Sequence, residues 1–361
     1  MRVVRIYHSA VVAAFRARDH RLRDRGVDLC LIAPTRWNEG GRDVHLDIAA
    51  HERSWLCPAR TVGRHPYVFA YDPRPIFRAL RRRPDLIDVH EEPASLAALE
   101  VLVLRALLGV RAPLTMYSAQ NIYKRYPPPF HWIERWAFRA AKAIYCCNTE
   151  AAEVLAAKGY RGAMPVIGLG IDTARFAPAQ HTAARPFTVG YVGRLESHKG
   201  VAVLIDALTQ VPSAELRVVG AGPDRTRLEE RAGALGSRVR FVDFVDHASL
   251  PGLYRTFDVV AIPSLPTPRW KEQFGRVAVE AMASGVPVVA SADGSLPEVV
   301  GPGGILVPPG DPDALADAIN QLLEHPELRD NYARAGREWV SRYSWEAVAD
   351  RHYRVYEAAT L

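Results

Sequence analysis

Two glutamates, Glu272 and Glu280, stand eight positions apart with Phe274 and Gly275 between them. One regular helix would separate their carboxylates by roughly 80° around the axis and about 12 Å along it, so it cannot present both to one ligand atom. We therefore expect Glu272 in a loop and a helix that begins near Gly275 and contains Glu280. The free N–H groups of residues 273–277 would then point at one place, which is typical of an anion site. Carboxylates on both sides of that site suit a nucleotide-sugar, which has hydroxyls on both sides of a phosphate.

A second group of residues with phosphate chemistry lies where another predicted strand ends in a Gly-Arg turn. This turn brings Arg194 and Lys199 to the same edge of the sheet. An arginine can hold two phosphate oxygens, and the compact ammonium of lysine suits a point contact. Basic residues at a solvated helix start are common, but beside the helix start at Gly275 they indicate a diphosphate site. Gly220 and Gly222 end the next strand and are weaker signals, because such pairs often serve only a tight turn.

Polar side chains also follow two predicted strands in the first half of the chain. His90 and Glu91 close one strand, and Gln120 and Asn121 close the next. Because the ends of neighbouring parallel strands meet at one edge of a sheet, we expect these four side chains to converge there. A single buried histidine is more often a core residue than a catalyst, so both interpretations of His90 stay open.

Short β-branched runs alternate with helical patterns along the whole chain, which predicts an α/β fold with parallel sheets and helices on both faces. Strands are expected at 2–7, 27–33, 85–89, 112–117, 142–146, 164–167, 187–192, 215–219, 239–242, 258–262, 286–290 and 304–307. Helices are expected at 10–25, 74–83, 93–109, 130–141, 149–158, 199–210, 224–235, 248–255, 275–284, 313–324, 327–341 and 345–359. Trp132, Trp136 and Phe138 recur at helical spacing and are interpreted as core. We read the turn at Asp293 as structural.

These elements group into two doubly wound, Rossmann-like domains that we expect to face each other across a cleft. We predict an N-terminal domain over residues 1–172, a linker over 173–186, a C-terminal domain over 187–341 and a final helical segment over 342–361. The linker prediction rests on the prolines and polar residues of that stretch.

Composition is that of an ordinary globular protein, with 48% hydrophobic and 24% charged residues among 361, enough for two cores. The most apolar stretch, 93–110, contains Glu100 and Arg105, so it predicts an amphipathic helix and no membrane span. The N-terminus reads as a first strand without the features of a signal peptide. Four cysteines lack metal-ligand or framework spacing and are expected to be reduced thiols in the cytoplasm.

Positive charge is concentrated in the first half of the chain. Residues 1–170 contain 26 Lys and Arg against 16 Asp and Glu, a net of +10, and the rest carries −4, which gives +6 overall. This bias favours an anionic partner such as a phosphorylated acceptor or an acidic membrane surface, although a generally arginine-rich composition explains it equally well. Arg81, Arg82 and Arg83 form a single cluster without interleaved aromatic residues, so we expect no nucleic-acid partner.

Three motifs together resemble those of the retaining glycosyltransferases of family 4, which have the two-domain GT-B fold. They are Glu272-x7-Glu280, Gly193-Arg-Leu-x3-Lys-Gly200 and Gly168-Leu-Gly-Ile-Asp172-x3-Phe176. The resemblance covers essentially the whole chain. It implies that Arg194 and Lys199 bind the donor diphosphate and that Glu280 binds the ribose hydroxyls. It also implies that Glu272 and the amides near Gly275 hold the transferred sugar, and that the last helix crosses back onto the first domain.

The chain departs from the family pattern at two strand ends. His8-Ser9-Ala10 follows the first strand, where family members usually have a glycine-rich loop. Gln120 stands where many members have a histidine, and an amide cannot take a proton from a hydroxyl near pH 7.

The resulting prediction is a cytoplasmic glycosyltransferase, with peripheral contact to the inner face of the membrane as a second option for its location. It is expected to need no metal because two cations face the diphosphate. The expected catalytic residues are Glu272, His90, Arg194 and Lys199. The expected donor-binding residues are Arg194, Lys199, Gly220, Gly222, Val245, Glu272, Phe274, Gly275, Arg276, Val277 and Glu280. The expected acceptor-binding residues are Ser9, His90, Glu91, Gln120, Asn121 and Arg125.

Resemblance to the family further implies transfer with retention, in which a donor phosphate oxygen accepts the acceptor's proton. We expect a nucleoside-diphosphate-sugar as co-substrate and no cofactor. The acceptor can be a small molecule, a phosphorylated compound or a lipid-linked one, and the sugar and base stay open. Two alternatives are a non-catalytic nucleotide- or sugar-binding protein and a nicotinamide dehydrogenase, although the dehydrogenase fingerprint Gly-x-Gly-x-x-Gly does not follow an early strand.

Overall fold

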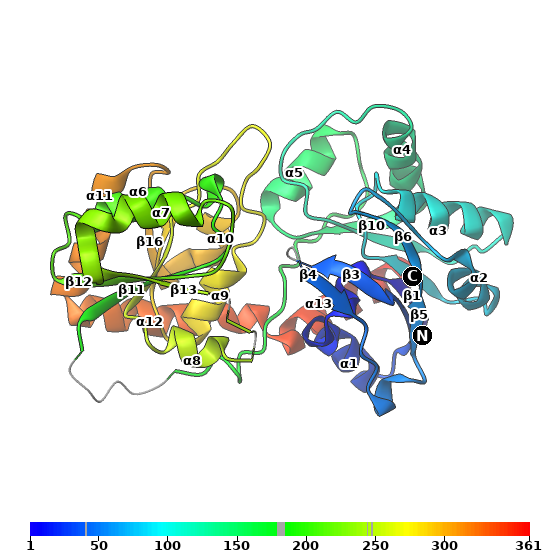
Figure 1. The fold of residues 1–361 in the computed structure, drawn as a ribbon. Coiled ribbons are helices and arrows are strands. Elements are labelled where there is room, and N and C mark those ends of the chain that lie inside the picture. Colours follow the sequence, from blue (N-terminus) through cyan, green and yellow to red (C-terminus); the bar gives the residue numbers. More distant parts are fainter. Residues whose placement is uncertain (40–41, 179–184, 244, 247) are drawn as a thin grey trace. The chain divides into compact units, whose positions relative to one another are not determined.

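A computed structural model of the chain describes residues 1–39, 42–178, 185–243, 245–246 and 248–361 (Figure 1). The contacts divide it into two compact units. Unit 1 comprises Met1–Gly170 together with Trp345–Leu361, and unit 2 comprises Ile171–Ser344. Residues 179–184 of the predicted linker lie outside the described residues.

The core of unit 1 is a six-stranded, all-parallel sheet in the order β10-β9-β8-β1-β2-β5. Its strands are β1 (Arg2–Ile6), β2 (Asp28–Pro34), β5 (Leu56–Ala59), β8 (Leu86–Val89), β9 (Leu114–Ser118) and β10 (Ala141–Cys146). Two antiparallel hairpins, β3 (Arg36–Glu39) with β4 (Arg42–His45) and β6 (Thr61–His65) with β7 (Val68–Tyr71), were not predicted. The predicted strand at 164–167 is wrong, since only isolated bridges from Ala163 and Val166 join that segment to β10.

Helices cover both faces of this sheet. They are α1 (Ala17–Asp24), α2 (Pro73–Arg81), α3 (Leu96–Leu107), α4 (Phe130–Ala140), α5 (Thr149–Ala157) and α13 (Trp345–Thr360). The predicted helix at 10–25 is interrupted, because two short 3-10 turns, His8–Val11 and Ala13–Arg16, come before α1. A third 3-10 turn covers Ala50–Glu52.

The interpretation of both tryptophans of α4 as core is wrong. Trp132 is 64% exposed and Trp136 is 37% exposed, whereas Ile133 and Ala137, which follow them in the sequence, are buried. Helical spacing places the two tryptophans on one face but does not tell which face is buried. Phe138 is partly buried against the core, as expected.

Unit 2 repeats the same arrangement, with a parallel sheet in the order β13-β12-β11-β14-β15-β16. Its strands are β11 (Phe187–Val192), β12 (Ala214–Val219), β13 (Val239–Val242), β14 (Val259–Ile262), β15 (Val288–Ser291) and β16 (Gly304–Val307). Its helices are α6 (Val201–Leu208), α7 (Arg225–Ala232), α8 (Leu250–Tyr254), α9 (Arg276–Ala283), α10 (Leu296–Val300), α11 (Pro312–Glu324) and α12 (Pro326–Val340). Short 3-10 turns cover Ser197–Lys199, Gly233–Arg238, Gly301–Gly303 and Ser341–Tyr343. The predicted class, two doubly wound α/β domains, is confirmed.

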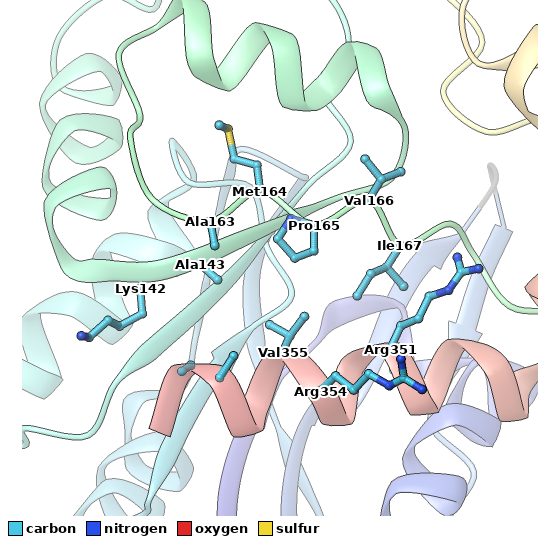
Figure 2. Close-up of a pocket in the computed structure, with 12 residues that line it drawn as sticks. Lys142, Ala143, Ala163, Met164, Pro165, Val166, Ile167, Arg351, Arg354 and Val355 are labelled. Atoms are coloured by element: carbon cyan, nitrogen blue, oxygen red, sulfur yellow. The ribbon is translucent and has the colours of Figure 1, made fainter. Parts of the chain in front are cut away.

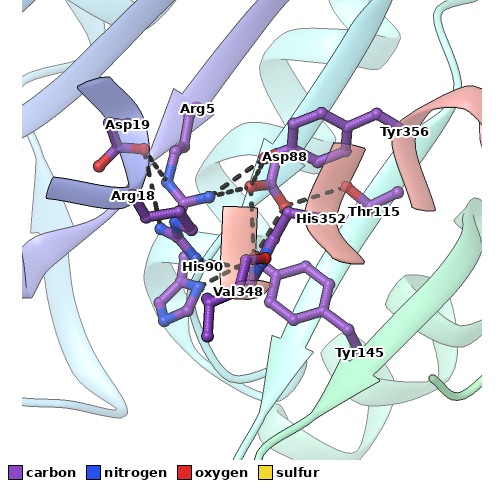
Figure 3. A network of polar contacts seen from close by, with 10 residues as sticks. All are labelled: Arg5, Arg18, Asp19, Asp88, His90, Thr115, Tyr145, Val348, His352 and Tyr356. Carbon is purple, nitrogen blue, oxygen red and sulfur yellow. Dashed lines mark hydrogen bonds and ion pairs between the residues drawn. The ribbon is translucent and has the colours of Figure 1, made fainter. Parts of the chain in front are cut away.

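A buried polar network fastens the C-terminal helix α13 to the sheet of unit 1 (Figure 3). The guanidinium of Arg5 lies 2.6 Å from Asp88, and the hydroxyl of Tyr356 on α13 donates to the same carboxylate at 2.6 Å. The hydroxyls of Thr115 and Tyr145 donate to its other oxygen. Arg5 and Asp88 are fully buried, so this helix is held by charge-assisted bonds as well as by apolar contacts.

The same network contains a histidine that must stay neutral. His352 on α13 donates through Nδ1 to the carbonyl of Val348, and its Nε2 accepts from Arg18 at 2.8 Å. Burial, helped by repulsion from Arg5, lowers the pKa of His352 to about 3. The unfolded chain therefore binds a proton at this histidine that the folded chain does not, once the pH falls below about 6.5.

We expect the stability of unit 1 to fall with decreasing pH between about 6.5 and 3, by at most about 1.4 kcal/mol per pH unit from this residue. His352→Gln keeps an acceptor for Arg18 but cannot be protonated, so it should lose less stability between pH 7 and pH 5 than the natural chain. The stability of unit 1 is measured in both proteins by urea unfolding at pH 7 and at pH 5. Protease cleavage within unit 1 reports the unfolded fraction. Equal losses in both proteins would show that His352 is not responsible.

Within the part of the chain that the structure describes, no helix is both long and apolar enough to cross a lipid bilayer.

Candidate functional site

The strand order of unit 2 changes direction between β11 and β14, which are paired in parallel at the middle of the sheet. Ligands of doubly wound sheets bind outside the carboxyl ends of the strands at such a point. The residues after β11 include Arg194 and Lys199, and those after β14 lead to Glu272. The motifs found in the sequence therefore gather at the expected position.

Lys199 and Glu272 form the central contact of this region. The ammonium of Lys199 lies 2.8 Å from the carboxylate of Glu272, and both side chains keep some exposure, at 19% and 16%. The hydroxyl of Ser264 lies 3.4 Å from the same carboxylate oxygen. Trp270, which the sequence did not single out, covers the ammonium at 4.4 Å from its ring centroid. A cation is thus held in place with its surroundings largely desolvated.

The backbone around Lys199 is fixed by a glycine. Gly200 has a φ of 71°, and a Cβ atom there would lie 1.8 Å from the carbonyl oxygen of Pro263. The amide of Leu265 also donates to the carbonyl of His198 at 2.8 Å. The turn that carries Lys199 therefore lies directly against the segment that follows β14.

Arg194 lies on the exposed side of the same loop. Its side chain is 55% exposed and pairs with Glu196 at 2.8 Å, so it does not share the contact between Lys199 and Glu272. The turn with Gly220 and Gly222 supports this loop, because Cβ atoms at these positions would lie 1.9 Å and 2.3 Å from the carbonyl oxygens of Gly193 and Leu195. These two glycines allow two loops to touch.

The helix α9 begins at Arg276, directly after Gly275, as predicted. Gly275 has a φ of 74° and caps the helix, and the N–H groups of the first turn have no acceptor within the helix itself. The carbonyl of Glu272 accepts from the amide of Ser295 at 3.1 Å, which ties the loop before α9 to the turn before α10. Phe274 is buried with its ring against Tyr343. Val277 follows Arg276 in the first turn of the helix.

Glu280 lies inside α9 as predicted, but its carboxylate is buried. Only 3% of the residue is exposed, and the hydroxyl of Tyr254 donates to it at 2.8 Å. Burial raises the pKa of Glu280, which Arg276 opposes. Its expected contact with ribose hydroxyls stays a prediction. Val245, another expected donor contact, is half-buried in the loop after β13.

The sheet of unit 1 has its own reversal point between β1 and β8. His8 follows β1, and Glu91 lies two residues after β8. The Nδ1 atom of His8 lies 2.5 Å from Glu91, and the backbone N–H of His8 donates to the same carboxylate at 2.8 Å. Burial opposes protonation of the ring, but the Glu91 carboxylate more than offsets it and raises the pKa of His8. Sequence reasoning missed His8 as a site residue, although Ser9 and Glu91 beside it were predicted.

His90 is buried and neutral. Its ring is stacked on Tyr117 with centroids 4.0 Å apart, and its Nδ1 lies 2.8 Å from the hydroxyl of Tyr145. Burial first, then repulsion from Arg5, lowers the pKa of His90 well below its usual value. These contacts are those of a packed core histidine.

The remaining predicted acceptor residues follow β1 and β9. Ser9 donates to Glu39 at 2.9 Å. Gln120 is buried, accepts from the hydroxyl of Tyr67 at 3.2 Å and donates to the carbonyl of Ile122 at 2.9 Å. Asn121 donates to Glu150 at 3.0 Å. Arg125 is exposed in the loop before α4. The side chains after β8 and β9 do lie at one sheet edge.

One group of possible metal ligands occurs within the described residues, and it lies elsewhere. Atoms of His20, His51 and Glu52 are within 4.8 Å of one another. Glu52 already pairs with the buried guanidinium of Arg16 through both oxygens, at 2.8 and 2.9 Å. That positive charge disfavours a second cation at the same carboxylate.

Comparison with known proteins covers almost the whole chain. Residues 20–175 match the family described as Glycosyltransferase Family 4, and residues 174–339 match the family described as Glycosyl transferases group 1. A phosphatidyl-myo-inositol mannosyltransferase of Mycobacterium leprae is 42% identical over 200 residues, which are 53% of this chain. The chain spans about half the length of that relative, 52%.

Two further similarities extend over more of the chain. A D-inositol 3-phosphate glycosyltransferase of Corynebacterium urealyticum is 35% identical over 293 residues, 71% of this chain and 68% of the relative. The crystal structure of Anabaena HepE in complex with UDP and glucose is similar with a TM-score of 0.74 and 21% identity, over 99% of this chain and 100% of that one. At this identity the structural similarity shows a shared fold.

Proposed function

We propose that this chain, which belongs to glycosyltransferase family 4, transfers a sugar from a nucleoside-diphosphate-sugar to an acceptor hydroxyl. The observation that carries this proposal is the position of Lys199. Its ammonium is held by Glu272 at the reversal point of the unit 2 sheet, in the loop region that leads to the start of α9. A cation and a helix N-terminus are what a departing diphosphate requires.

The chemistry asks the protein to stabilise negative charge that develops as the bond from sugar to phosphate breaks. Lys199 and Arg194 would hold the phosphate oxygens, and the first-turn amides of α9 would add their partial positive charge. Glu272 would then accept hydrogen bonds from the sugar hydroxyls. We further propose retention of configuration, with the donor phosphate taking the acceptor's proton, as in the family.

Two protein cations at the diphosphate would replace the divalent metal that many transferases use. We propose that transfer proceeds without a metal. Activity that is unchanged by EDTA would agree with this, and activity that EDTA abolishes and Mg²⁺ restores would contradict it.

The function is tested by incubating the purified protein with UDP-, GDP-, ADP- and dTDP-sugars and measuring nucleotide release. A transferase should release nucleotide slowly from its own donor, and faster with a suitable acceptor. Thermal shifts with the free diphosphates identify the base, since only a bound nucleotide stabilises the fold. Binding without any release, with or without acceptors, would instead favour the non-catalytic alternative.

For the acceptor, we propose a polyol that carries a phosphate or a lipid-linked phosphate. The names of the two inositol-directed relatives point to that class. In unit 1, His8 is 20% exposed at the reversal point of the sheet, and the Glu91 carboxylate raises the pKa of its ring, which favours the protonated form that an anionic acceptor would contact. The net charge of +10 in residues 1–170 also favours an anionic acceptor.

The exposed face of α4 suggests how an acceptor in a membrane would be reached. Trp132 and Trp136 lie one turn apart on it, and Arg135 and Arg139 are exposed on the same helix. Its one acidic residue, Glu134, is buried. Tryptophan favours the interface between headgroups and acyl chains, and arginines favour acidic lipids. We propose peripheral contact with an acidic membrane surface through this face.

Flotation with liposomes tests this contact. The natural chain should float with vesicles that contain phosphatidylglycerol and much less with pure phosphatidylcholine. Trp132→Ser with Trp136→Ser should reduce the bound fraction several-fold, and so should Arg135→Glu with Arg139→Glu. The matched control, Arg227→Glu with Arg231→Glu on α7, should bind as the natural chain does. Equal binding by all variants would reject α4 as the contact.

A further inference from the structure

Unit 1 contains a cavity of about 630 Å³ between residues 163–167 and the C-terminal helix α13 (Figure 2). This volume is within the range of small-molecule sites, roughly 300–1,000 Å³. None of the residues proposed for the donor or the acceptor lines it. The cavity therefore needs an explanation of its own.

The walls of the cavity are preformed and apolar. Residues 163–167 are fixed along the edge strand β10, because Ile144 and Cys146 donate to the carbonyls of Ala163 and Pro165, both at 2.9 Å. The opposite wall is α13, whose other face is held in the core by Tyr356. Small side chains on both walls, such as Ala163 and Ala358, leave the space between them open.

The charged residues around this cavity are all basic. Arg351 and Arg354 extend from α13 at the end near Ile167, and Lys142 lies at the opposite end (Figure 2). Arg354 also pairs with Asp350 at 2.9 Å, but no acidic residue is among those that line the cavity. A half-open apolar cavity with two guanidinium groups at one end complements a molecule with an apolar tail and an anionic head.

We propose that this cavity binds a single-chain anionic amphiphile of the alkyl phosphate type. The alkyl chain would lie along residues 163–167 and α13, and the phosphate would contact Arg351 and Arg354. This site is separate from the proposed donor and acceptor sites, since its residues belong to β10, to residues 163–167 and to α13. The site would bind free alkyl phosphates or lipid phosphates that carry an alkyl chain of similar length.

Calorimetric titration with dodecyl phosphate, below the concentration at which it forms micelles, tests the site. The natural chain should bind one equivalent, whereas inorganic phosphate and dodecyl maltoside should bind at least tenfold more weakly, because each lacks the chain or the charge. Arg351→Ala with Arg354→Ala should weaken binding at least tenfold. Ala358→Leu should weaken it as well by filling the cavity, and a thermal melt checks that this variant is folded.

The matched control is Arg227→Ala with Arg231→Ala on unit 2, which removes two exposed arginines and should leave binding unchanged. A vesicle arm distinguishes the sources. If lysophosphatidic acid in vesicles competes with dodecyl phosphate, the site takes lipid phosphates, and if it does not, the site takes free alkyl phosphates. The proposal would be overturned by an absence of saturable binding. It would also be overturned if the Arg351/Arg354 variant and the Ala358 variant both bound dodecyl phosphate as tightly as the natural chain.

Discussion

Replacing Lys199 by alanine should lower the rate of sugar transfer by about 10²–10³-fold, the loss seen when one preorganised group that stabilises developing charge is removed. Lys199 is the cation that Glu272 holds in place at 2.8 Å, and Trp270 shields it from water. Lys199→Ala removes a positive charge that is already in position when the diphosphate departs, so that no reorganisation of the protein is needed. The effect should appear in kcat more than in the donor KM, because the charge grows in the transition state.

Three controls separate this effect from loss of folding. Lys199→Arg keeps the charge but not its compact shape, so it should retain more activity than Lys199→Ala. Arg231→Ala removes a surface cation of the same unit that pairs with Asp206 at 2.6 Å, and it should be fully active. Thermal melts should agree within a few degrees for all variants. Near-normal transfer by a folded Lys199→Ala protein would defeat the site assignment.

The local structure of the candidate donor site could be predicted because its residues come in local motifs. The helix start at Gly275 and the turn before Gly200 each follow from a few neighbouring residues and the rule that strand ends gather ligands. The burial of Glu280 against Tyr254 could not be predicted, since exposure depends on a partner 26 residues away in the chain. Trp270 was missed because nothing in the sequence marks an aromatic residue as the neighbour of a particular lysine.

The pair of His8 and Glu91 could have been found from the sequence. In a doubly wound sheet the first strand lies beside the first strand of the second half, which is β8 in unit 1. Polar residues that follow these two strands are therefore neighbours. The sequence analysis did not predict β5, because Leu56–Ala59 is short and contains a proline. Without β5, β8 counts as a strand of the first half of the sheet, and its position beside β1 is not expected. Burial of α4 through Ile133 and Ala137 was equally hidden, since its tryptophans have the same helical spacing.

The network around Asp88 shows how much one buried carboxylate can determine. It accepts from Arg5 and Tyr356 at 2.6 Å each, and from Thr115 and Tyr145 at 2.9 and 3.0 Å. Those four partners come from three other strands of the sheet, β1, β9 and β10, and from the helix α13. Asp88→Ala would leave the guanidinium of Arg5 with Asp19 as its remaining carboxylate, 3.3 Å away. Removing one partner of a buried ion pair costs about 3–5 kcal/mol.

We therefore expect Asp88→Ala to destabilise unit 1 by about 3–5 kcal/mol and to loosen α13 from the sheet. Hydrogen–deuterium exchange resolved by peptide should show faster exchange in α13 and in β1, while β11 and α9 of unit 2 keep their protection. Asp28→Ala is the matched control, because it breaks an exposed pair with Arg2 in the same sheet and should cost at most about 1 kcal/mol. If both variants exchanged alike, the attachment of α13 would rest on apolar packing, and the polar network would be dispensable for it.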